Sequence, residues 1–245
     1  MDNNHCQESS IHEIKKSCKD AFHAFMVKGA KYDGYYDMPT IPQNSDLDIK
    51  NLVPYDKTYR HNYKPGDVVH FYLYDQLFDG PRGIWNGLSN NESFKHGFTL
   101  DRLAGATAII TPDFSLYLDM PRVMQIWNIY RSRAIGYYLS TLGYNVIPNV
   151  RWTDDESYKY AFDGLEQGMI VSVGTLGCSK ESQDIALLIN GFAEMIKRIR
   201  PRLVLIYGPI VNELNSIIKK FSVNIIQFDS EIANYYRRNE YGNEI

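Results

Sequence analysis

The chain has 245 residues, of which 44% are apolar, so it is long and apolar enough to bury a substantial core. Its formal net charge of −3, with both signs interspersed, argues against an overall electrostatic attraction to duplex nucleic acid or anionic lipid. Three scattered cysteines without a CxxC pair do not form a disulfide framework, and the longest apolar runs are far shorter than a membrane span. We therefore expect a cytoplasmic globular protein without a signal peptide or membrane segment.

The first residues predict an arm that precedes the main domain. Ile11, Ile14, Cys18, Phe22 and Phe25 recur at helical spacing, which indicates an amphipathic helix that packs on the body, on a second copy or on a host protein. The stretch KGAKYDGYYDMPTIPQNSD is rich in turn residues and predicts an extended connector. We divide the chain into an arm and connector at 1–37, an α/β domain at 38–230 and a polar tail at 231–245.

The following residues alternate between short β-branched runs and longer segments of helical period. Six strands are predicted, at VVHFYLYD, TAIITPDF, NVIPNV, MIVSVG, LVLIYG and NIIQFD. Helices are predicted at 121–142, 184–199 and 210–221, with shorter helical pieces near 84–103 and 155–163. This alternation predicts an α/β fold with a mainly parallel sheet, which is either an irregular TIM-like barrel or a doubly wound open sheet.

Polar residues follow several of the predicted strands, where both architectures bind ligands. Asp75 follows the first strand, and Asp113 and Ser115 follow the second. Converging carboxylates bind a divalent cation or divide into a general acid and a general base. The alternatives are ordinary: Asp113 or Asp119 would cap the following helix, and Asp75 would be a solvated loop carboxylate.

The predicted helix at 121–142 carries a polar stripe that includes Asn128 and Arg131. Arg131 and Arg133 point about 200° apart on a helix, so only one of them can face a ligand at the strand ends. We select Arg131 as the residue that would hold an anionic group, against the alternative of a structural ion pair.

Other features are weaker. Gly174 and Gly177 fit a tight turn better than an anion-binding loop, and the basic run from Lys197 to Arg202 is typical of a solvated helix end. The sequence has no HExxH, GxSxG or Walker motif, which argues against zinc hydrolysis and Ser-His-Asp chemistry.

An ordered set of motifs resembles a known family. VVHFYLYD, TPDFSLYLDMP, WNIYRSRAIGYYLSTLGYNVIPNVRW, FDG and RLVLIYG are similar to a domain-of-unknown-function family found in bacteria, phages and integrated mobile elements. The resemblance covers roughly residues 38 to 210 and implies a phage or mobile-element context rather than a reaction. The motif positions are Asp75, Asp113, Ser115, Asn128, Arg131, Arg133, Trp152 and Tyr207.

We expect an enzyme that acts on a nucleotide or nucleic-acid phosphoester. Asp75 and Asp113 would bind Mg²⁺ or Mn²⁺ or serve as acid and base, and Ser115 and Arg131 would complete the catalytic group. Substrate contacts are expected from Asn128, Arg133, Trp152 and Tyr207. One alternative is a glycosyl-bond hydrolase that uses the two carboxylates without a metal. Another is a phage or mobile-element factor without catalytic activity that binds a host protein or DNA.

Overall fold

The computed structural model describes residues 20, 22–88, 98, 100–178, 181–231 and 233, and most of the predicted N-terminal helix and C-terminal tail lie outside them. Within these residues, seven parallel strands form two sheets. They are β3 (Asn51–Pro54), β4 (Asp67–His70), β5 (Ala108–Ile110), β6 (Val146–Ile147), β7 (Ile170–Gly174), β8 (Leu203–Tyr207) and β9 (Ile225–Phe228). All six predicted strands are present, and β3 is an additional strand.

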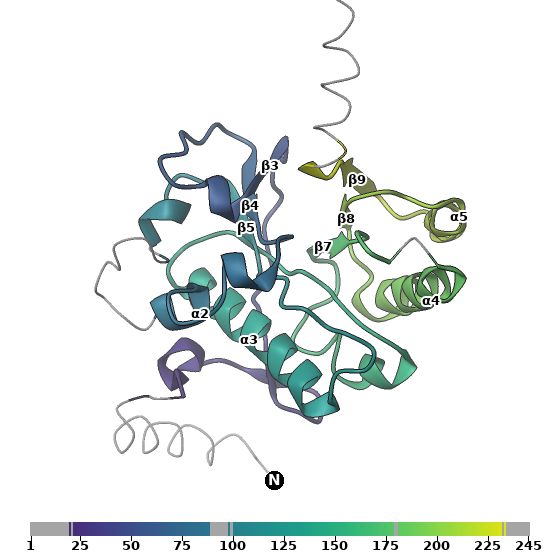
Figure 1. Cartoon of the computed structure of the whole chain (residues 1–245), viewed down its shortest axis with the longest axis horizontal. Helices are drawn as coiled ribbons and strands as arrows, with labels where there is room; N and C mark the ends of the chain where they lie inside the picture. The colour runs from purple at the N-terminus through teal and green to yellow at the C-terminus, as the bar shows by residue number, and fades with distance from the viewer. Residues whose placement is uncertain are drawn as a thin grey trace, which may run out of the picture.

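The helices confirm the predicted alternation. They are α2 (Ile84–Gly87), α3 (Arg122–Thr141), α4 (Ser182–Ile199) and α5 (Asn212–Phe221), with short 3₁₀ helices η1 (Ala24–Val27), η2 (Tyr55–Lys57), η3 (Asp75–Leu77), η4 (Leu100–Leu103) and η5 (Asp155–Lys159). Figure 1 shows α4 and α5 beside the three-stranded sheet and α2 and α3 beside the four-stranded sheet. None of the described helices combines the length and the apolar run needed to cross a bilayer.

Part of the predicted connector is structured. Strands β1 (Tyr32–Asp33) and β2 (Met38–Pro39) form a short antiparallel pair, and Met38 is fully buried. In the preceding segment, the Phe25 ring contacts the Tyr138 ring edge-on at 5.0 Å between centroids. These contacts attach the described end of the arm to α3.

Strand order distinguishes the two expected architectures. Every strand from β3 to β9 lies next to its neighbours in sequence, without the reversal of order that defines a doubly wound sheet. The break between β6 and β7 is joined by a parallel bridge between Asn149 and Ser172. This strand order is also found in TIM-type barrels, but no strand pair joins β3 to β9 among the described residues, so what the structure shows there is two parallel α/β sheets.

We call the junction between β6 and β7 the seam. A side-chain bridge joins the two sheets at its other end, where β6 and β7 begin. The Asn44 amide nitrogen donates to the carbonyls of Val146 (3.0 Å) and Ile170 (2.8 Å), and its oxygen accepts from the Ile170 N–H (2.8 Å). The buried side chain therefore takes the place of ladder hydrogen bonds between β6 and β7.

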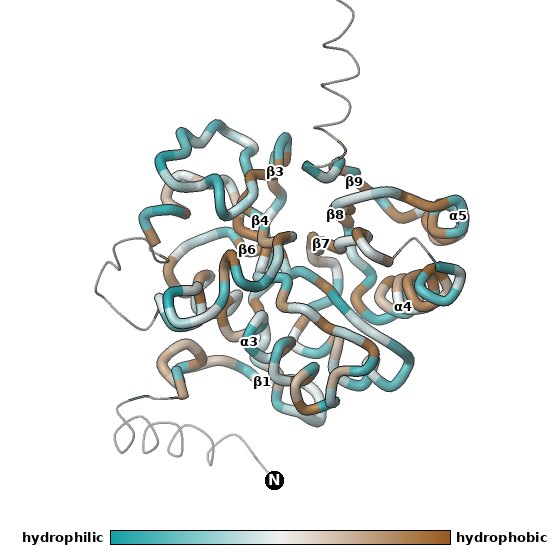
Figure 2. Tube along the Cα trace, in the orientation of Figure 1, coloured by the Kyte–Doolittle hydropathy of each residue, from teal (hydrophilic) through white to brown (hydrophobic). Residues whose placement is uncertain are grey.

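Alternate residues of each strand enter two different cores. The interior cluster contains residues of the strands and of the segments that flank them, from Val68 and Tyr72 around to Leu205 and Tyr207. The intervening residues, such as Val69 and Val171, join a larger cluster with the helices. In Figure 2 the strands are coloured as apolar at the centre of the molecule. Strands β4 to β8 are thus largely buried on both faces, and polar side chains gather at their carboxyl ends.

Candidate functional site

The central polar contact of the candidate site joins the ends of β5 and β6. Asp113 follows β5, and one of its carboxylate oxygens pairs with Arg151 Nη1 at 2.6 Å. Its other oxygen accepts from the side-chain amide of Asn149 at 2.7 Å. Both partners follow β6, so the local chain direction places a carboxylate, an amide and a guanidinium at adjacent strand ends.

Tyr72, beyond the end of β4, extends this contact into the interior cluster. Its hydroxyl donates to the Asn149 side-chain oxygen at 3.0 Å and lies 2.6 Å from the Ser172 hydroxyl. Burial, followed by the charge of Asp113, raises the pKa of Tyr72 well above its usual value, so the hydroxyl stays a donor. Tyr72 and Asn149 together orient the Asp113 carboxylate. We call Tyr72, Ser172, Asn149, Asp113 and Arg151 the strand-end network.

Arg151 is the member of the strand-end network that reaches solvent. Its side chain is 28% exposed, against 11% for Asp113. The charge of Asp113 is the main cause that raises the pKa of Arg151, and Cys178 and Asp75 add to it, so both groups lie nearby. Its Nε and Nη2 have no hydrogen-bond partner within the described part of the chain. These donors are therefore available to an anion.

Asp75 lies on the neighbouring strand end and binds Ser115. The Ser115 hydroxyl donates to one Asp75 oxygen at 2.8 Å, and the Ser115 N–H donates to the other at 3.2 Å. The segment that carries Asp113 and Ser115 is thereby connected to the end of β4. Asp75 and Asp113 thus belong to one region of the molecule, as the sequence predicts.

Arg131 and Asn128 support this segment from α3. Arg131 pairs with Asp79 at 2.7 Å, donates to Asn128 Oδ1 at 2.6 Å and stacks over the Phe114 ring at 3.9 Å. Asn128 donates in turn to the Ser115 carbonyl at 2.7 Å. Arg131 thus forms the structural ion pair that the sequence left as its alternative role. The guanidinium bound to Asp113 is that of Arg151.

Three further predicted residues have contacts away from the strand-end network or inside the core. Arg133 is fully buried and donates to the carbonyls of Asp163, Asn149 and Ala161. Trp152 donates to the Leu187 carbonyl at 3.0 Å and packs on α4. Tyr207 is buried in the interior cluster and stacks on Tyr72 at 4.8 Å, so it lies beneath the strand-end network.

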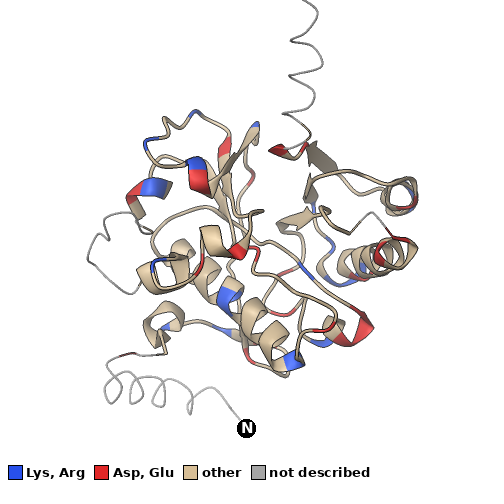
Figure 3. Ribbon diagram, viewed as in Figure 1, with Lys and Arg blue, Asp and Glu red and all other residues tan. Residues whose placement is uncertain are grey.

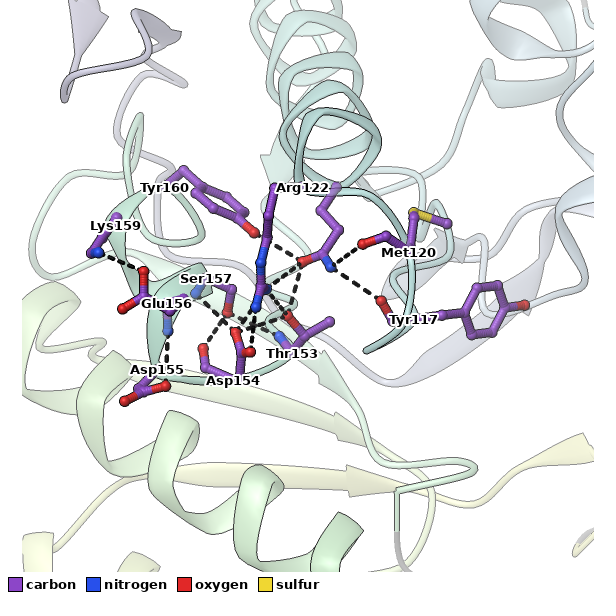
Figure 4. A network of polar contacts seen from close by, with 11 residues as sticks. Tyr117, Met120, Arg122, Thr153, Asp154, Asp155, Glu156, Ser157, Lys159 and Tyr160 are labelled. Atoms are coloured by element: carbon purple, nitrogen blue, oxygen red, sulfur yellow. Dashed lines mark hydrogen bonds and ion pairs between the residues drawn. The ribbon is translucent and has the colours of Figure 1, made fainter.

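The start of α3 differs from the sequence prediction. Its N-cap residue is Pro121, without a side-chain cap, so the expected capping role of Asp119 is wrong. Buried Gln125 fixes this end instead, because its amide nitrogen donates to the carbonyls of Tyr117 and Met120. Its oxygen accepts from the hydroxyls of Thr153 (2.9 Å) and Tyr160 (2.8 Å), within the network drawn in Figure 4.

The described residues do not form a preformed metal cage. They contain no group of three or more His, Cys, Asp or Glu side chains placed to hold a metal ion. Both oxygens of Asp113 already have cationic or amide partners, whereas Asp75 binds only the neutral donors of Ser115. Of the two predicted metal ligands, Asp75 is the one with a carboxylate charge that no cation neutralises among its described contacts.

The basic run at the end of α4 is engaged within the protein. Arg198 bonds to Glu194 and the Tyr158 carbonyl, and Arg202 bonds to Asp46 and three backbone carbonyls. Figure 3 shows charges of both signs interspersed over the elements. This surface does not form an extended basic patch of the kind that binds nucleic acid.

The sequence analysis did not identify Tyr72, Asn149 or Arg151 as residues of the site. A signal for Tyr72 exists, because it lies two residues after His70 on the inward side of a strand. Arg151 could have been found as the first charged residue after the buried run at 146–150. Nothing in the local sequence shows that Arg151 pairs with Asp113.

Comparison with known proteins now adds the family context. Residues 30–229 match the family described as "Domain of unknown function (DUF4417)". The chain belongs to this family. The match includes the strand-end network and all the motif positions that carry the resemblance seen in the sequence.

Two relatives of this DUF4417 member come from phages. The "Gene 1 protein" of Mycobacterium phage D29 is 35% identical over 143 residues, which cover 58% of this chain and 49% of that protein. The "Gene 1 protein" of Mycobacterium phage L5 is 35% identical over 145 residues, which cover 59% of this chain and 58% of that protein. The chain thus spans about half the length of these relatives. No solved structure matches the chain.

Proposed function

We propose that this phage-type protein is an enzyme that acts on a phosphoester of a nucleotide or nucleic acid, with Arg151 as the phosphate-binding residue. The observation that carries the proposal is the strand-end network itself. Burying a tyrosine and an amide beside a partly buried ion pair costs free energy, and replacing such groups by apolar ones is often neutral or stabilising. A polar network at the carboxyl ends of parallel strands is instead where this winding of strands positions ligands.

Each group has a chemical role in this proposal. Arg151 binds phosphate oxygens through Nε and Nη2, while Asp113 keeps its guanidinium in place. Asp75 accepts a proton from the attacking water. The oxygen of that water bonds to phosphorus, the bond from phosphorus to the leaving oxygen breaks, and the leaving oxygen takes up a proton from solvent while Asp75 releases its own to solvent.

In this proposal a divalent metal enters with the substrate rather than occupying a preformed cage. Mg²⁺ commonly uses one or two carboxylates together with substrate phosphates and water. Asp75 would then be a ligand of the metal instead of the base, and the metal would neutralise phosphate charge and lower the pKa of bound water. The arrangement favours glycoside hydrolysis less, because Asp113 already shares both oxygens with Arg151 and Asn149.

Thermal unfolding with inorganic pyrophosphate, with and without MgCl₂, tests the phosphate site. We expect pyrophosphate to raise the melting temperature of the wild type, since a ligand at 100 times its Kd stabilises by about 2.7 kcal/mol. Arg151→Gln should abolish the increase. Arg122→Gln is the matched control, because Arg122 is also a partly exposed arginine paired with an aspartate, Asp154. A wild type that does not respond to pyrophosphate, or an Arg151→Gln variant that responds fully, would overturn the proposal.

A role in protein interaction is the second candidate, and one surface feature favours it. Val123, Met124 and Trp127 lie on one side of α3 with 71%, 49% and 44% of their surfaces exposed. Adjacent exposed apolar side chains often mark an interface. Sedimentation of the wild type and of Met124→Glu would test whether this surface joins two copies of the chain.

A further inference from the structure

Two exposed tyrosines flank the contact between Asp75 and Ser115. Tyr74 immediately precedes Asp75 and is 79% exposed, and Tyr117 lies two residues after Ser115 and is 58% exposed. Both therefore expose aromatic rings to solvent on the two segments that the contact between Asp75 and Ser115 joins. An exposed ring is ordinary by itself, but two beside a strand-end site are a recognition surface.

Tyr117 is held in place at both ends. Its main-chain carbonyl accepts from the buried Gln125 amide at 3.1 Å, and its hydroxyl donates to the Ser115 hydroxyl at 3.3 Å. In Figure 4 its carbonyl points toward the Gln125 network while its ring points away from that network. The ring is thus exposed on a fixed backbone, which reduces the conformational entropy that binding would remove.

Tyr74 is anchored through its main chain in a similar way. Its carbonyl accepts from the Leu77 N–H at 2.9 Å, which closes the first turn of η3. The next residue, Asp75, is held by both donors of Ser115. The position of the Tyr74 backbone is therefore coupled to the site, while its ring remains free to contact a ligand.

We propose that Tyr74 and Tyr117 stack on a nucleobase, so that the site recognises a nucleotide unit rather than a phosphate alone. This inference rests on the proposed function, because it needs Arg151 to bind the phosphate of the same ligand. Aromatic side chains stack on every base and so provide affinity with little sequence preference. The stacked base could belong to a free nucleotide or to the end of a single strand, and the choice of probes distinguishes these two ligands.

Calorimetric titration with adenosine 5′-monophosphate and ribose 5-phosphate tests the stacking role. We expect the wild type to bind the nucleotide roughly tenfold more tightly than the sugar phosphate, the effect of about one stacked base. Tyr117→Ala and Tyr74→Ala should each reduce this ratio without changing the affinity for ribose 5-phosphate. Tyr117→Phe keeps the ring and should keep the ratio. Tyr35→Ala is the matched control, because Tyr35 is 89% exposed in the turn between β1 and β2.

The outcomes separate this inference from the proposed function. If neither adenosine 5′-monophosphate nor ribose 5-phosphate binds, the proposed phosphate site is wrong, and the stacking inference is wrong with it. If both bind equally, or if both alanine variants keep the wild-type ratio, the phosphate site stands and the stacking inference is overturned. A thymidine octanucleotide that binds more tightly than the mononucleotide, with the gain lost in Tyr117→Ala, supports stacking on a single strand. Tighter binding by the mononucleotide, with the same loss, supports stacking on a free nucleotide.

Discussion

His70 should make the protein lose stability in mild acid. Its side chain is 1% exposed, and its Nδ1 accepts from the Tyr72 N–H at 3.1 Å. Burial, with a smaller effect of the Lys57 charge, lowers the pKa of His70 from 6.5 to about 3. The folded protein therefore keeps this imidazole neutral, whereas the unfolded chain takes up a proton below pH 6.5. Stability is fully present above that pH and is lost as the pH falls toward 3.

The size of this loss follows from the width of the window. Each pH unit between the two pKa values costs about 1.4 kcal/mol of unfolding free energy, so the loss from pH 6.5 to 5 is about 2 kcal/mol. Urea unfolding at several pH values, followed by tryptophan fluorescence, measures it. His70→Leu should be less stable at pH 7 but should lack this part of the pH dependence.

A second histidine provides the control for this measurement. His61 is 30% exposed and lies 3.2 Å from Asp67, away from the interior cluster. His61→Asn should leave the His70 contribution in place. If the wild type and His70→Leu lose stability in parallel between pH 6.5 and 5, the assignment of acid sensitivity to His70 is wrong.

Two core substitutions have consequences that the contacts define. Gln125→Leu leaves two hydroxyls and two carbonyls without their amide partner. It should lower the unfolding free energy, measured by chemical denaturation, by about 3 kcal/mol. A loss below about 1 kcal/mol would contradict the role of Gln125. Gly191→Ala would place a Cβ 2.0 Å from Trp152 Nε1, so the indole must move and stability should fall by roughly 1–3 kcal/mol. Unchanged stability and unchanged tryptophan emission would show that α4 accommodates the methyl group without moving Trp152.

The sequence predicts most of the fold, because the spacing of apolar residues in its central strands and helices matches the faces that these elements bury. The run at 203–207 is apolar throughout, as expected for a strand covered on both faces, and α4 ends where Pro201 prevents its continuation. Strand β3 was missed because Asn51 and Pro54 are both residues that strands usually avoid. Among the described residues it pairs with β4 and with no other strand, which is the edge position that tolerates proline.

The candidate site could be located from the sequence more easily than its contacts could be assigned. Asp75, Asp113 and Ser115 were placed correctly in one region because the ends of adjacent parallel strands meet there. We chose Arg131 as the anion-binding residue from its helical spacing, but its guanidinium is already paired with Asp79, which lies on the same side of α3. Arg151 is 38 residues from Asp113, and no local pattern reports a pairing over that separation.

The Asn44 bridge has a consequence for the order in which contacts can form. Its two acceptor carbonyls lie 102 and 126 residues away along the chain, so this bridge cannot form from local sequence. Closing loops of that length costs conformational entropy before the contact forms. The bridge between Asn149 and Ser172 closes a much shorter loop, so β6 and β7 can meet before Asn44 joins them. Within the strand-end network, the late contact would be that of Tyr72, whose partner Ser172 is 100 residues away.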